Sequence, residues 1–421
     1  MTQDLPAFFT QGLMKDDHRE VPAIGVGMLG YSFMGRAHTN ALKKITYTYW
    51  PPPMQPELVG IAGRTQSAVD EAARRYGYAK STTDWRELVE DPAIGLFDNT
   101  GPNDQHKEPT IAAARAGKHV ICEKPLGRTA DEAYEIWTEV AKTGVKAMTA
   151  FNYRFFPAIR LIKEMLDDGT LGEVRHFRAR YHQEWLVDPK SPTSWRLDKS
   201  IAGSGALGDL GAHIIDLSRY LVGEPVSVSA NMKTFVEDRP GGHVDVDDAF
   251  DAIITFDTGA LGTLEATRVA PGRKNHMRFE ISTTKGTVIF DQERMNEIEL
   301  HLADSTPGPK AQGFRTVLVS ESYHPYWEHW WPHGHMIGWE DSFVHELGHL
   351  LQAIADDTEI GPHGASLEDG YRCAEVTDAI ERSATTGARQ EIVYRQASEG
   401  GGAPLRKTAA QGTLIRSQRL E

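Results

Sequence analysis

Two segments of the sequence carry residues that could move a proton and stabilise a negative charge on oxygen. Lys124 follows a short apolar run in HVICEKPLG, where an ammonium could favour the alkoxide that forms as a hydride leaves carbon. Asp209 and His213 stand four residues apart in GSGALGDLGAHIIDLSRYL, so a helix would place them on one stripe with Asp216. A histidine between carboxylates has a pKa suited to accepting a proton near neutrality. The alternatives are an ion pair of Glu123 with Lys124, a structural His–Asp pair, or a metal pair.

A glycine-rich stretch, GVGMLGYSFMG at residues 25–35, fits the dinucleotide-binding pattern GxGxxG in two ways. The complete match uses Gly25, Gly27 and Gly30, but only EVPA precedes it, and that segment cannot supply the strand that must end there. The imperfect match uses Gly30, Ser32 and Gly35, with AIGVGML as the strand and a helix after the turn. We predict the second alignment, in which the Ser32 hydroxyl could donate to a phosphate oxygen.

The second strand of such a domain, ELVGIAG, ends at Gly63 and is followed by Arg64. An acidic residue at this point would bind the ribose hydroxyls of NAD, whereas an arginine accommodates the 2′-phosphate of NADP. Arg64 could also stack on the adenine ring. These residues favour NADP but leave the choice between NAD and NADP open.

The segment HELGH at residues 345–349 matches the zinc-protease pattern HExxH, with Glu346 in the place of the base. Apolar residues of the same helix define a buried face, and His345 and His349 lie nearly opposite to it. Both histidines are therefore expected to face solvent, and Glu368, the candidate third ligand, stands at the start of another helix. We expect no bound metal and keep a zinc hydrolase only as an alternative.

An irregular segment, YHPYWEHWWPHGHMIGWE at residues 323–340, is dense in tryptophan, tyrosine and histidine. Aromatic faces stack on the C–H faces of sugar rings, and histidines can bond sugar hydroxyls. We therefore assign His333 and His335 to substrate binding. The alternative is a loop that packs its own aromatic side chains or forms a subunit contact.

The elements that must position these residues fall into two groups. Residues 22–150 alternate short apolar runs with helical stretches, and after residue 150 the period changes to two, in runs such as HFRARYH and FDAIITF. We predict an α/β protein with an N-terminal Rossmann doubly wound parallel sheet and a C-terminal α/β domain with a large, mainly antiparallel open sheet. The expected parts are an arm at 1–21, a dinucleotide-binding domain at 22–150, a substrate-binding and oligomerisation domain at 151–396 and a tail at 397–421.

The composition restricts the partners. The 421 residues carry a net charge of −14 and no basic block, so the average surface would repel nucleic acid and anionic membranes. No apolar run approaches about 18 residues, and the N-terminus lacks a signal-peptide pattern. Cys122 and Cys373 are the two cysteines of the chain, which fits a reducing compartment. We expect a cytoplasmic protein with no nucleic-acid or membrane partner.

Five segments, taken in order, resemble the Gfo/Idh/MocA family of oxidoreductases: GYSFMGRAH, GPNDQH, AGKHVICEKPLG, FNYRFFPA and GSGALGDLGAHIID. The resemblance covers residues 22–395 and implies a Rossmann domain, an α/β domain whose open sheet lines the substrate site, and a homodimer or homotetramer. It also implies that Lys124, Asp209 and His213 form the catalytic set. Longer segments, among them PTSWRLDKSIAGSGALGDLGAH and WPHGHMIGWEDSF, are similar to the branch with levoglucosan dehydrogenase, glycoside 3-dehydrogenases and inositol dehydrogenases.

The resemblance also assigns residues to the two ligands. The positions around the dinucleotide match Gly30, Ser32, Phe33, Met34, Arg64, Asn99, Pro102, Asn103, His106, Glu123, Lys124 and Asn152. The substrate-side positions match Arg154, Trp195 and Arg196, together with Lys124, Asp209 and His213. Two residues depart from the family pattern: Ser32 replaces a glycine, and Gly63-Arg64 replaces the acidic position, so NAD and NADP both stay open.

We therefore expect an NAD(P)-dependent dehydrogenase that oxidises a CH–OH group of a cyclic sugar, glycoside or cyclitol, with C3 of a pyranoside as the expected carbon. His213 would accept the hydroxyl proton, Lys124 would stabilise the oxyanion and Asp209 would orient His213. One alternative is redox-neutral glycoside cleavage, in which a tightly held NAD oxidises the ring, elimination expels the aglycone and hydride returns. Another is a cofactor-sensing regulator on the same fold, with no catalytic activity.

Overall fold

A six-stranded parallel sheet forms the N-terminal part of the protein, as the alternating apolar runs predict. The computed structural model describes residues 20–303 and 311–397, so most of the predicted arm and tail lies outside the described residues. The strand order β3-β2-β1-β4-β5-β6 reverses between β1 and β4, the point where ligands bind in such sheets. The strands are β1 (Ala23–Leu29), β2 (Gln55–Ala62), β3 (Lys80–Thr82), β4 (Leu96–Asn99), β5 (His119–Glu123) and β6 (Ala147–Ala150).

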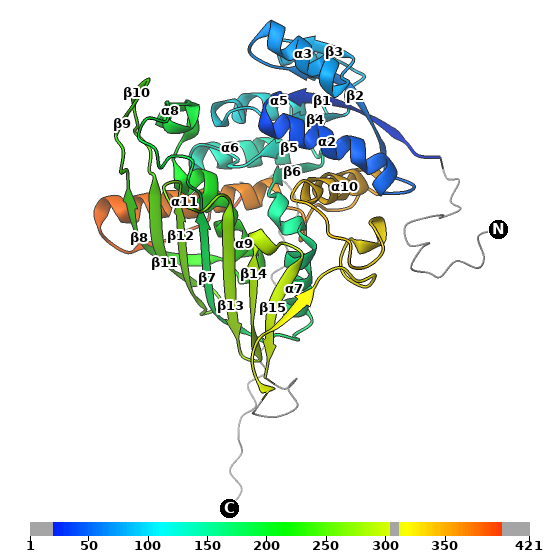
Figure 1. Ribbon diagram of the computed structural model, residues 1–421. Helices are drawn as coiled ribbons and strands as arrows, with labels where there is room; N and C mark the ends of the chain where they lie inside the picture. The colour runs from blue at the N-terminus through cyan, green and yellow to red at the C-terminus, as the bar shows by residue number, and fades with distance from the viewer. Residues whose placement is uncertain (1–19, 304–310, 398–421) are drawn as a thin grey trace, which may run out of the picture.

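Five helices connect the strands of this sheet and surround it in the upper part of Figure 1. They are α2 (Phe33–Thr48), α3 (Gln66–Tyr76), α4 (Arg86–Glu90), α5 (Lys107–Arg115) and α6 (Ala130–Ala141). Gly25 and Gly27 lie inside β1, and α2 begins only at Phe33. The strand and the helix predicted around the glycine-rich stretch are therefore confirmed.

A nine-stranded sheet of order β16-β15-β14-β13-β7-β12-β11-β8-β17 forms the second part. The β7–β12 pair is parallel and the other pairs are antiparallel, which confirms the predicted, mainly antiparallel sheet. Its strands are β7 (Val174–His182), β8 (Pro225–Lys233), β11 (Ala249–Phe256), β12 (Leu261–Thr267), β13 (His276–Thr283), β14 (Gly286–Asp291), β15 (Glu297–Leu302), β16 (Arg315–Leu318) and β17 (Gln390–Glu391), and a separate ribbon pairs β9 (Asp238–Arg239) with β10 (Gly242–His243).

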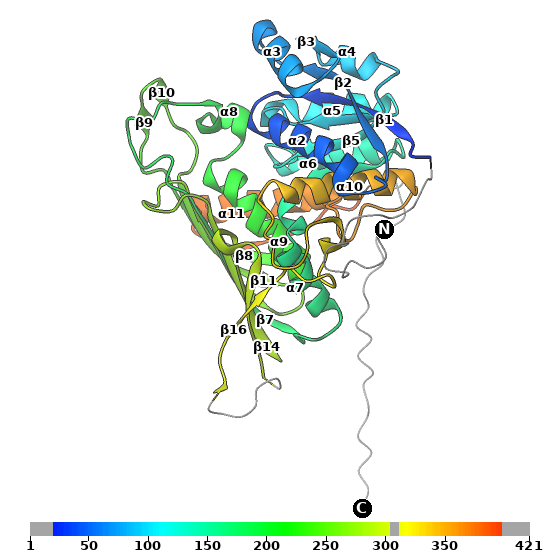
Figure 2. The same ribbon diagram turned by 45° about the vertical axis from the view of Figure 1, so that its right-hand side comes forward.

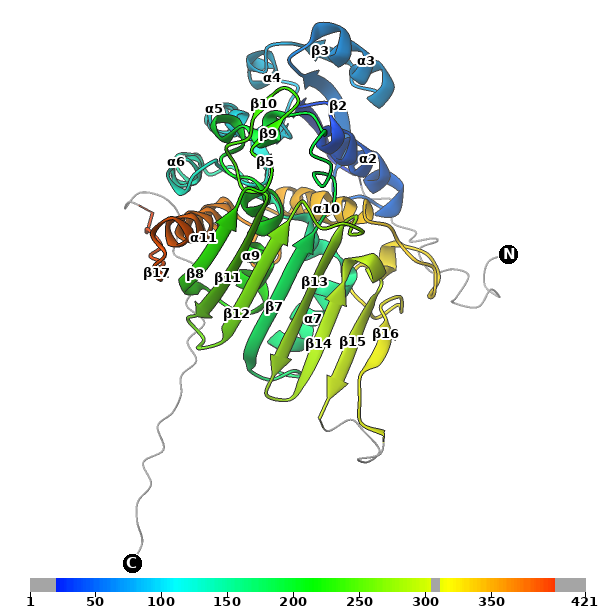
Figure 3. The same ribbon diagram turned by 60° about the vertical axis from the view of Figure 1, so that its left-hand side comes forward.

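Helices cover one face of the large sheet and leave the other face open (Figures 2 and 3). The alternation along β7 follows this division, since Phe177 and Tyr181 are buried while Arg178 and His182 point to the open side. The covering helices include α7 (Pro157–Asp167), α9 (Ala212–Leu221) and α11 (Leu367–Thr386), and the short α8 (Lys199–Ala202) precedes α9.

A helix near the end of the described chain, α10 (Asp341–Ala355), packs against α2 of the N-terminal part. Phe343, Val344 and Leu347 share one hydrophobic core with Ile24 and Val26 of β1. The core beneath the first sheet is therefore completed by residues more than three hundred positions further along the chain. No helix within residues 20–303 and 311–397 combines the length and the hydropathy that crossing a bilayer requires.

The expectation that His345 and His349 face solvent is wrong, as the packing of α10 shows. His345 is fully buried and His349 is half-buried, because α10 lies between α2 on one side and the segment around Phe155 on the other. The Nε2 atom of His345 accepts a hydrogen bond from Trp330 Nε1 at 2.6 Å, and Nδ1 donates to the Phe155 carbonyl oxygen at 2.9 Å. Both ring nitrogens are therefore used within the fold, and the HELGH segment serves packing.

Candidate active site

Lys124 and Asp209 meet at the boundary between the two sheets. Lys124 directly follows β5, and Asp209 lies in a π-helical turn, Leu207–Gly211, that leads into α9. The Nζ atom of Lys124 donates to the Asp209 carbonyl oxygen at 2.9 Å and to its carboxylate Oδ1 at 3.0 Å. The sequence predicts a regular helix here, whereas the observed π turn is of a type often found at functional sites. The ammonium is thus fixed at the carboxyl end of a parallel strand.

Arg268 holds the second oxygen of the same carboxylate, a contact that the sequence analysis missed. It follows β12, and its Nη2 atom donates to Asp209 Oδ2 at 2.9 Å from a side chain that is almost fully buried. Burial alone would raise the pKa of Asp209, but Lys124, Arg268 and Arg196 outweigh it and hold that pKa below its ordinary value. Asp209 is therefore a carboxylate that bridges two cations.

His213 lies on α9 one turn after Asp209, as predicted, but its surroundings differ from the prediction. Its ring stacks on Tyr153 at a centroid distance of 4.2 Å, and its Nδ1 atom is buried without a hydrogen-bond partner. Burial, and then the charge of Lys124, lower the pKa of His213 well below its ordinary value of 6.5, against the opposing effect of Asp209. The imidazole is therefore neutral at pH 7 and can accept a proton.

Two expectations about the carboxylates around His213 are wrong. Both oxygens of Asp209 bind Lys124 and Arg268, and no hydrogen bond joins Asp209 to His213 among the described residues. Asp216 points away and pairs with Arg154, whose Nε and Nη2 atoms donate to it at 2.8 and 2.5 Å. Because burial and then the charge of Lys124 lower its pKa, His213 does not have the near-neutral pKa expected of a histidine between two carboxylates.

Arg154 itself is buried rather than presented to a ligand. Only 3% of its side chain is exposed, and besides Asp216 its guanidinium lies 3.5 Å from Asp369. This buried arginine ties the segment after β6 to α9 and α11. The Arg154 side chain is therefore not exposed to a substrate in this structure, and its expected role in substrate binding stays a prediction.

Two tryptophan–arginine pairs lie next to Asp209. The Arg196 guanidinium sits 4.4 Å above the Trp195 ring, and that of Arg268 sits 5.3 Å from the Trp185 ring. The Arg196 carbonyl oxygen also accepts a hydrogen bond from Arg268 at 3.4 Å. The predicted Trp195-Arg196 pair is thus joined to the Lys124–Asp209 contact through Arg268, and its role in substrate binding stays a prediction.

The turn after β1 has the form that a dinucleotide requires. Gly30 has a φ of +102°, and a Cβ added there would lie 2.6 Å from the Thr100 carbonyl oxygen. Ser32, Phe33 and Met34 then open α2, and the Ser32 side chain makes no capping hydrogen bond. The first N–H groups of the helix and this hydroxyl are therefore available to a pyrophosphate, so the residues present fit an NAD-type cofactor.

The end of β2 explains why no acidic residue follows that strand at position 63. A Cβ added to Gly63 would lie 2.1 Å from the Tyr31 ring, so any side chain at this position would collide with it. Arg64 is exposed next to this contact. The packing of Tyr31 therefore accounts for a glycine at position 63. The absence of an acidic side chain at this position does not by itself indicate a preference for NADP.

Asn99 and His106 are both assigned to the dinucleotide. Their side chains are buried and bind backbone carbonyl oxygens of the loop after β4 and of its neighbour. Asn99 Nδ2 donates to the Gln105 carbonyl oxygen at 3.0 Å. The ring nitrogens of His106 lie 2.8 and 3.1 Å from the carbonyl oxygens of Pro125 and Gly101. These contacts fix the loop after β4 against the loop that carries Lys124, which is where a nicotinamide ring would have to be positioned.

Two further asparagines of the predicted set connect the N-terminal sheet to other parts. Asn103 Nδ2 donates to the Ala202 carbonyl oxygen at 2.8 Å, and Asn152 Nδ2 donates to Ser342 Oγ at 2.8 Å. Pro102 is exposed just before Asn103. Pro102 and Asn103 follow β4 next to the switch point, whereas Asn152 follows β6 at the edge of the sheet, and the contact of all three with the dinucleotide stays a prediction.

The aromatic segment before α10 serves mainly to pack the two parts together. Trp327 and Trp330 are buried in the core that α10 shares with the first sheet, and Trp339 stacks on Phe33 at 5.5 Å. His333 and His335 are both exposed. Substrate binding by these two histidines stays a prediction, whereas most of the tryptophans act as packing residues.

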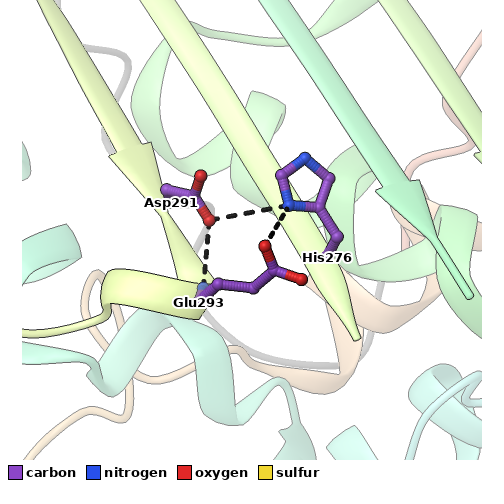
Figure 4. A group of neighbouring side chains, drawn as sticks. All are labelled: His276, Asp291 and Glu293. Carbon is purple, nitrogen blue, oxygen red and sulfur yellow. Dashed lines mark hydrogen bonds and ion pairs between the residues drawn. The ribbon is translucent and has the colours of Figure 1, made fainter. Parts of the chain in front are cut away.

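One group of side chains on the open face of the large sheet could bear on metal binding (Figure 4). His276 Nδ1 lies 3.2 Å from a Glu293 carboxylate oxygen and 3.7 Å from one of Asp291. Arg273 Nη1 lies 3.4 Å from both His276 Nδ1 and the Glu293 carboxylate, and Arg278 lies 3.7 Å from Asp291. Because these arginines already neutralise the carboxylates, we do not assign a metal to this group.

Known protein families match both parts of the chain. Residues 24–151 match an oxidoreductase family with an NAD-binding Rossmann fold, and residues 159–289 match the GFO/IDH/MocA C-terminal domain. The resemblance seen in the sequence motifs is therefore confirmed, and so is the expectation of an NAD-binding enzyme.

Named relatives are sugar and inositol dehydrogenases. The levoglucosan dehydrogenase of Pseudarthrobacter phenanthrenivorans is 42% identical over 380 residues, which are 86% of this chain and 96% of that protein. The myo-inositol 2-dehydrogenase of Thermotoga maritima is 29% identical over 71% of this chain and 84% of that protein. A solved structure of levoglucosan dehydrogenase in complex with NADH and levoglucosan is similar with a TM-score of 0.86, at 42% identity over 89% of this chain and 100% of that chain. With its parallel and open sheets and its Lys124–Asp209 contact, the chain belongs to the Gfo/Idh/MocA family of NAD-binding oxidoreductases.

Proposed function

We propose that this protein oxidises a CH–OH group of a cyclic sugar, glycoside or cyclitol, with C3 of a pyranoside as the expected carbon. The observation that carries the proposal is the Lys124 ammonium, fixed by Asp209 at the carboxyl end of β5 in an NAD-binding domain. NAD supplies the acceptor for the hydride that leaves the ring carbon. The CH–OH group becomes a carbonyl: the hydroxyl proton passes to the protein, and the hydrogen on the same carbon leaves with its bonding electron pair as hydride.

The residues around Lys124 divide this work. The neutral imidazole of His213 accepts the hydroxyl proton, and the Lys124 ammonium stabilises the oxygen as it becomes an alkoxide. Asp209 positions Lys124 and not His213, since its carboxylate binds Lys124 on one side and Arg268 on the other. This assignment replaces the orientation of His213 that the sequence motif suggested.

The preferred cofactor in this proposal is NAD. The similar structures that contain NADH support this choice. The glycine at position 63 is accounted for by its contact with the Tyr31 ring and therefore indicates no preference for a 2′-phosphate. The exposed Arg64 lies where it could still contact the adenosine end of either cofactor.

A panel of substrates tests the function. Purified protein is mixed with levoglucosan, methyl glucosides, free sugars or inositols, with NAD and NADP in separate reactions, and the absorbance of reduced cofactor is followed. We expect at least one cyclic sugar or cyclitol to give reduced cofactor, with the larger kcat/KM for NAD. Release of an aglycone without net NADH would favour redox-neutral cleavage instead, and cofactor binding without any turnover would favour a regulator.

The open face of the large sheet is where we propose that copies of the chain associate into a homodimer or homotetramer. It carries cross-strand ion pairs, Arg178 with Glu280 at 3.5 Å and His182 with Glu265 at 3.1 Å. Ile253, 64% exposed, adds an apolar side chain that a partner would bury. Light scattering should give the mass of a dimer or tetramer, and Ile253→Glu should weaken the association. A monomeric wild-type protein would contradict the proposal.

The cytoplasmic location inferred from the cysteines stays a prediction.

A further inference from the structure

A buried histidine, His38, joins three elements beneath the site. It lies on α2 and is fully buried between Asp98 of β4 and Glu123 of β5. Its Nδ1 atom lies 3.0 Å from the Asp98 carboxylate, and its Nε2 atom lies 3.1 Å from Glu123 Oε1. None of the catalytic roles described above uses this Asp98–His38–Glu123 chain.

The chain ends on the backbone of Lys124. The second carboxylate oxygen of Glu123, Oε2, accepts a hydrogen bond from the Lys124 backbone N–H at 3.0 Å. Asp209 holds the other end of the same residue, at Nζ. Lys124 is therefore fixed at its backbone by the first sheet and at its ammonium by the π turn before α9.

The contacts of His38 favour its charged form, although burial also raises the pKa of its partner Asp98. A neutral imidazole can donate from only one nitrogen, whereas both nitrogens of His38 face carboxylate oxygens. Burial alone would lower the pKa of His38, but Asp98 and Glu123 prevail and raise it well above its ordinary value. The imidazolium donates to both carboxylates and so holds the Glu123 side chain where its Oε2 atom accepts the Lys124 N–H.

One more acidic side chain, Glu346, interacts with the Asp98, His38 and Glu123 side chains. Glu346 of α10 is fully buried, and neither of its carboxyl oxygens has a hydrogen-bond partner. Burial raises the pKa of Glu346 well above its ordinary value, against the opposing charge of His38. Burial therefore favours the protonated form of Glu346, in which it competes less with Asp98 and Glu123 for the positive charge of His38.

We propose that His38 is a positioning residue for Lys124, which acts through the Glu123 carboxylate on the Lys124 backbone and thereby sets the rate of turnover. The proposal rests on the catalytic role of Lys124 proposed above. Without the imidazolium, the buried Glu123 side chain would lose the hydrogen-bond donor that holds its Oε1 atom in place. Its contact with the Lys124 N–H would then loosen, and the ammonium would lose its alignment with the substrate oxygen.

A His38→Gln variant tests this role against a matched control, His345→Gln, which removes an equally buried histidine with hydrogen bonds at both ring nitrogens. We expect His38→Gln to lower kcat roughly 10–100-fold, since small misplacements at a reacting group cost up to this much. The dissociation constant for NADH, measured by fluorescence, should change less than about threefold, because loss of a positioning contact acts on turnover. The isotope effect on kcat with a substrate deuterated at the oxidised carbon should rise, which a smaller fraction of folded enzyme cannot produce.

The outcomes separate this proposal from the one on which it rests. A wild-type enzyme that oxidises no sugar of the panel removes both. An active wild type whose His38→Gln variant keeps kcat within about threefold, or loses no more than His345→Gln, removes only the positioning role. If His38→Gln does not fold, the Asp98→Asn variant decides. The asparagine keeps a hydrogen-bond acceptor for His38 but removes the negative charge that favours the imidazolium, so kcat should still fall. An unchanged kcat would overturn the proposal.

Discussion

A Lys124→Ala variant is expected to lose kcat by roughly 10²–10³-fold or more, the usual cost of removing a donor that stabilises a developing oxyanion. The loss follows because Arg268, the buried cation on the other side of Asp209, already donates to that carboxylate and cannot replace Lys124 at the substrate oxygen. NADH binding should persist, since the turn at Gly30 and the start of α2 are untouched. Steady-state kinetics and fluorescence titration with NADH measure the two effects separately.

Lys118→Ala is the matched control for this variant. Lys118 precedes β5 as Lys124 follows it, is buried where Lys124 is half-buried, and donates through Nζ to the Asp91 carbonyl oxygen at 2.7 Å. It stands at the opposite end of the strand from the site, so its loss should leave kcat near that of the wild type. Equal losses in both variants, or full activity of Lys124→Ala, would remove Lys124 from the mechanism.

Replacing His213 with Asn should lower kcat/KM by about 10²–10⁴-fold, the range of a general base, and should change the pH profile. In the wild type His213 must be neutral to accept a proton, and its pKa lies well below 6.5. The rate of sugar oxidation should therefore hold as the pH falls through 6.5 and decline only at lower pH, where His213 becomes protonated.

The His213→Asn variant should lack this acidic decline, because the group that titrates is gone. His119→Asn serves as the control, since His119 is a half-buried histidine at the start of β5, away from Lys124. An acidic limb that is the same in His213→Asn and the wild type would assign the proton acceptor to another group.

The features of the fold and site that could be predicted are those that a local segment decides. The strand over Ala23–Leu29 and the turn at Gly30 follow from where an apolar run stops and from the conformation that only glycine adopts freely. The stripe of Asp209 and His213 follows likewise from helical spacing, and the structure keeps them one turn apart.

The features that could not be predicted depend on contacts between distant segments. Arg268 reaches Asp209 from a strand that is nearly sixty residues further along, and nothing local marks it except its place at the end of a period-two run. Asp216 and Arg154 likewise neutralise each other across the fold, so the carboxylate that the helix stripe offered to His213 is not available.

The HELGH segment shows the same limit for a sequence motif. Its helix has one strongly apolar face, and the opposite face could be assigned to solvent only if nothing else packed on it. In the structure α2 and the segment around Phe155 enclose the helix, so His345 binds backbone and tryptophan. Burial on both sides cannot be inferred from the periodicity of one helix.

The transfer of hydride from a ring carbon to NAD is tested most directly by isotope labelling. Levoglucosan and a methyl glucoside, each with deuterium at C3, are incubated with NAD and the enzyme, and the reduced cofactor is analysed by mass spectrometry. Deuterated NADH together with a 3-keto sugar is expected from the wild type and not from Lys124→Ala. NADH without deuterium, or aglycone release with no deuterium in free NADH, would contradict oxidation at C3 as the net reaction of this enzyme.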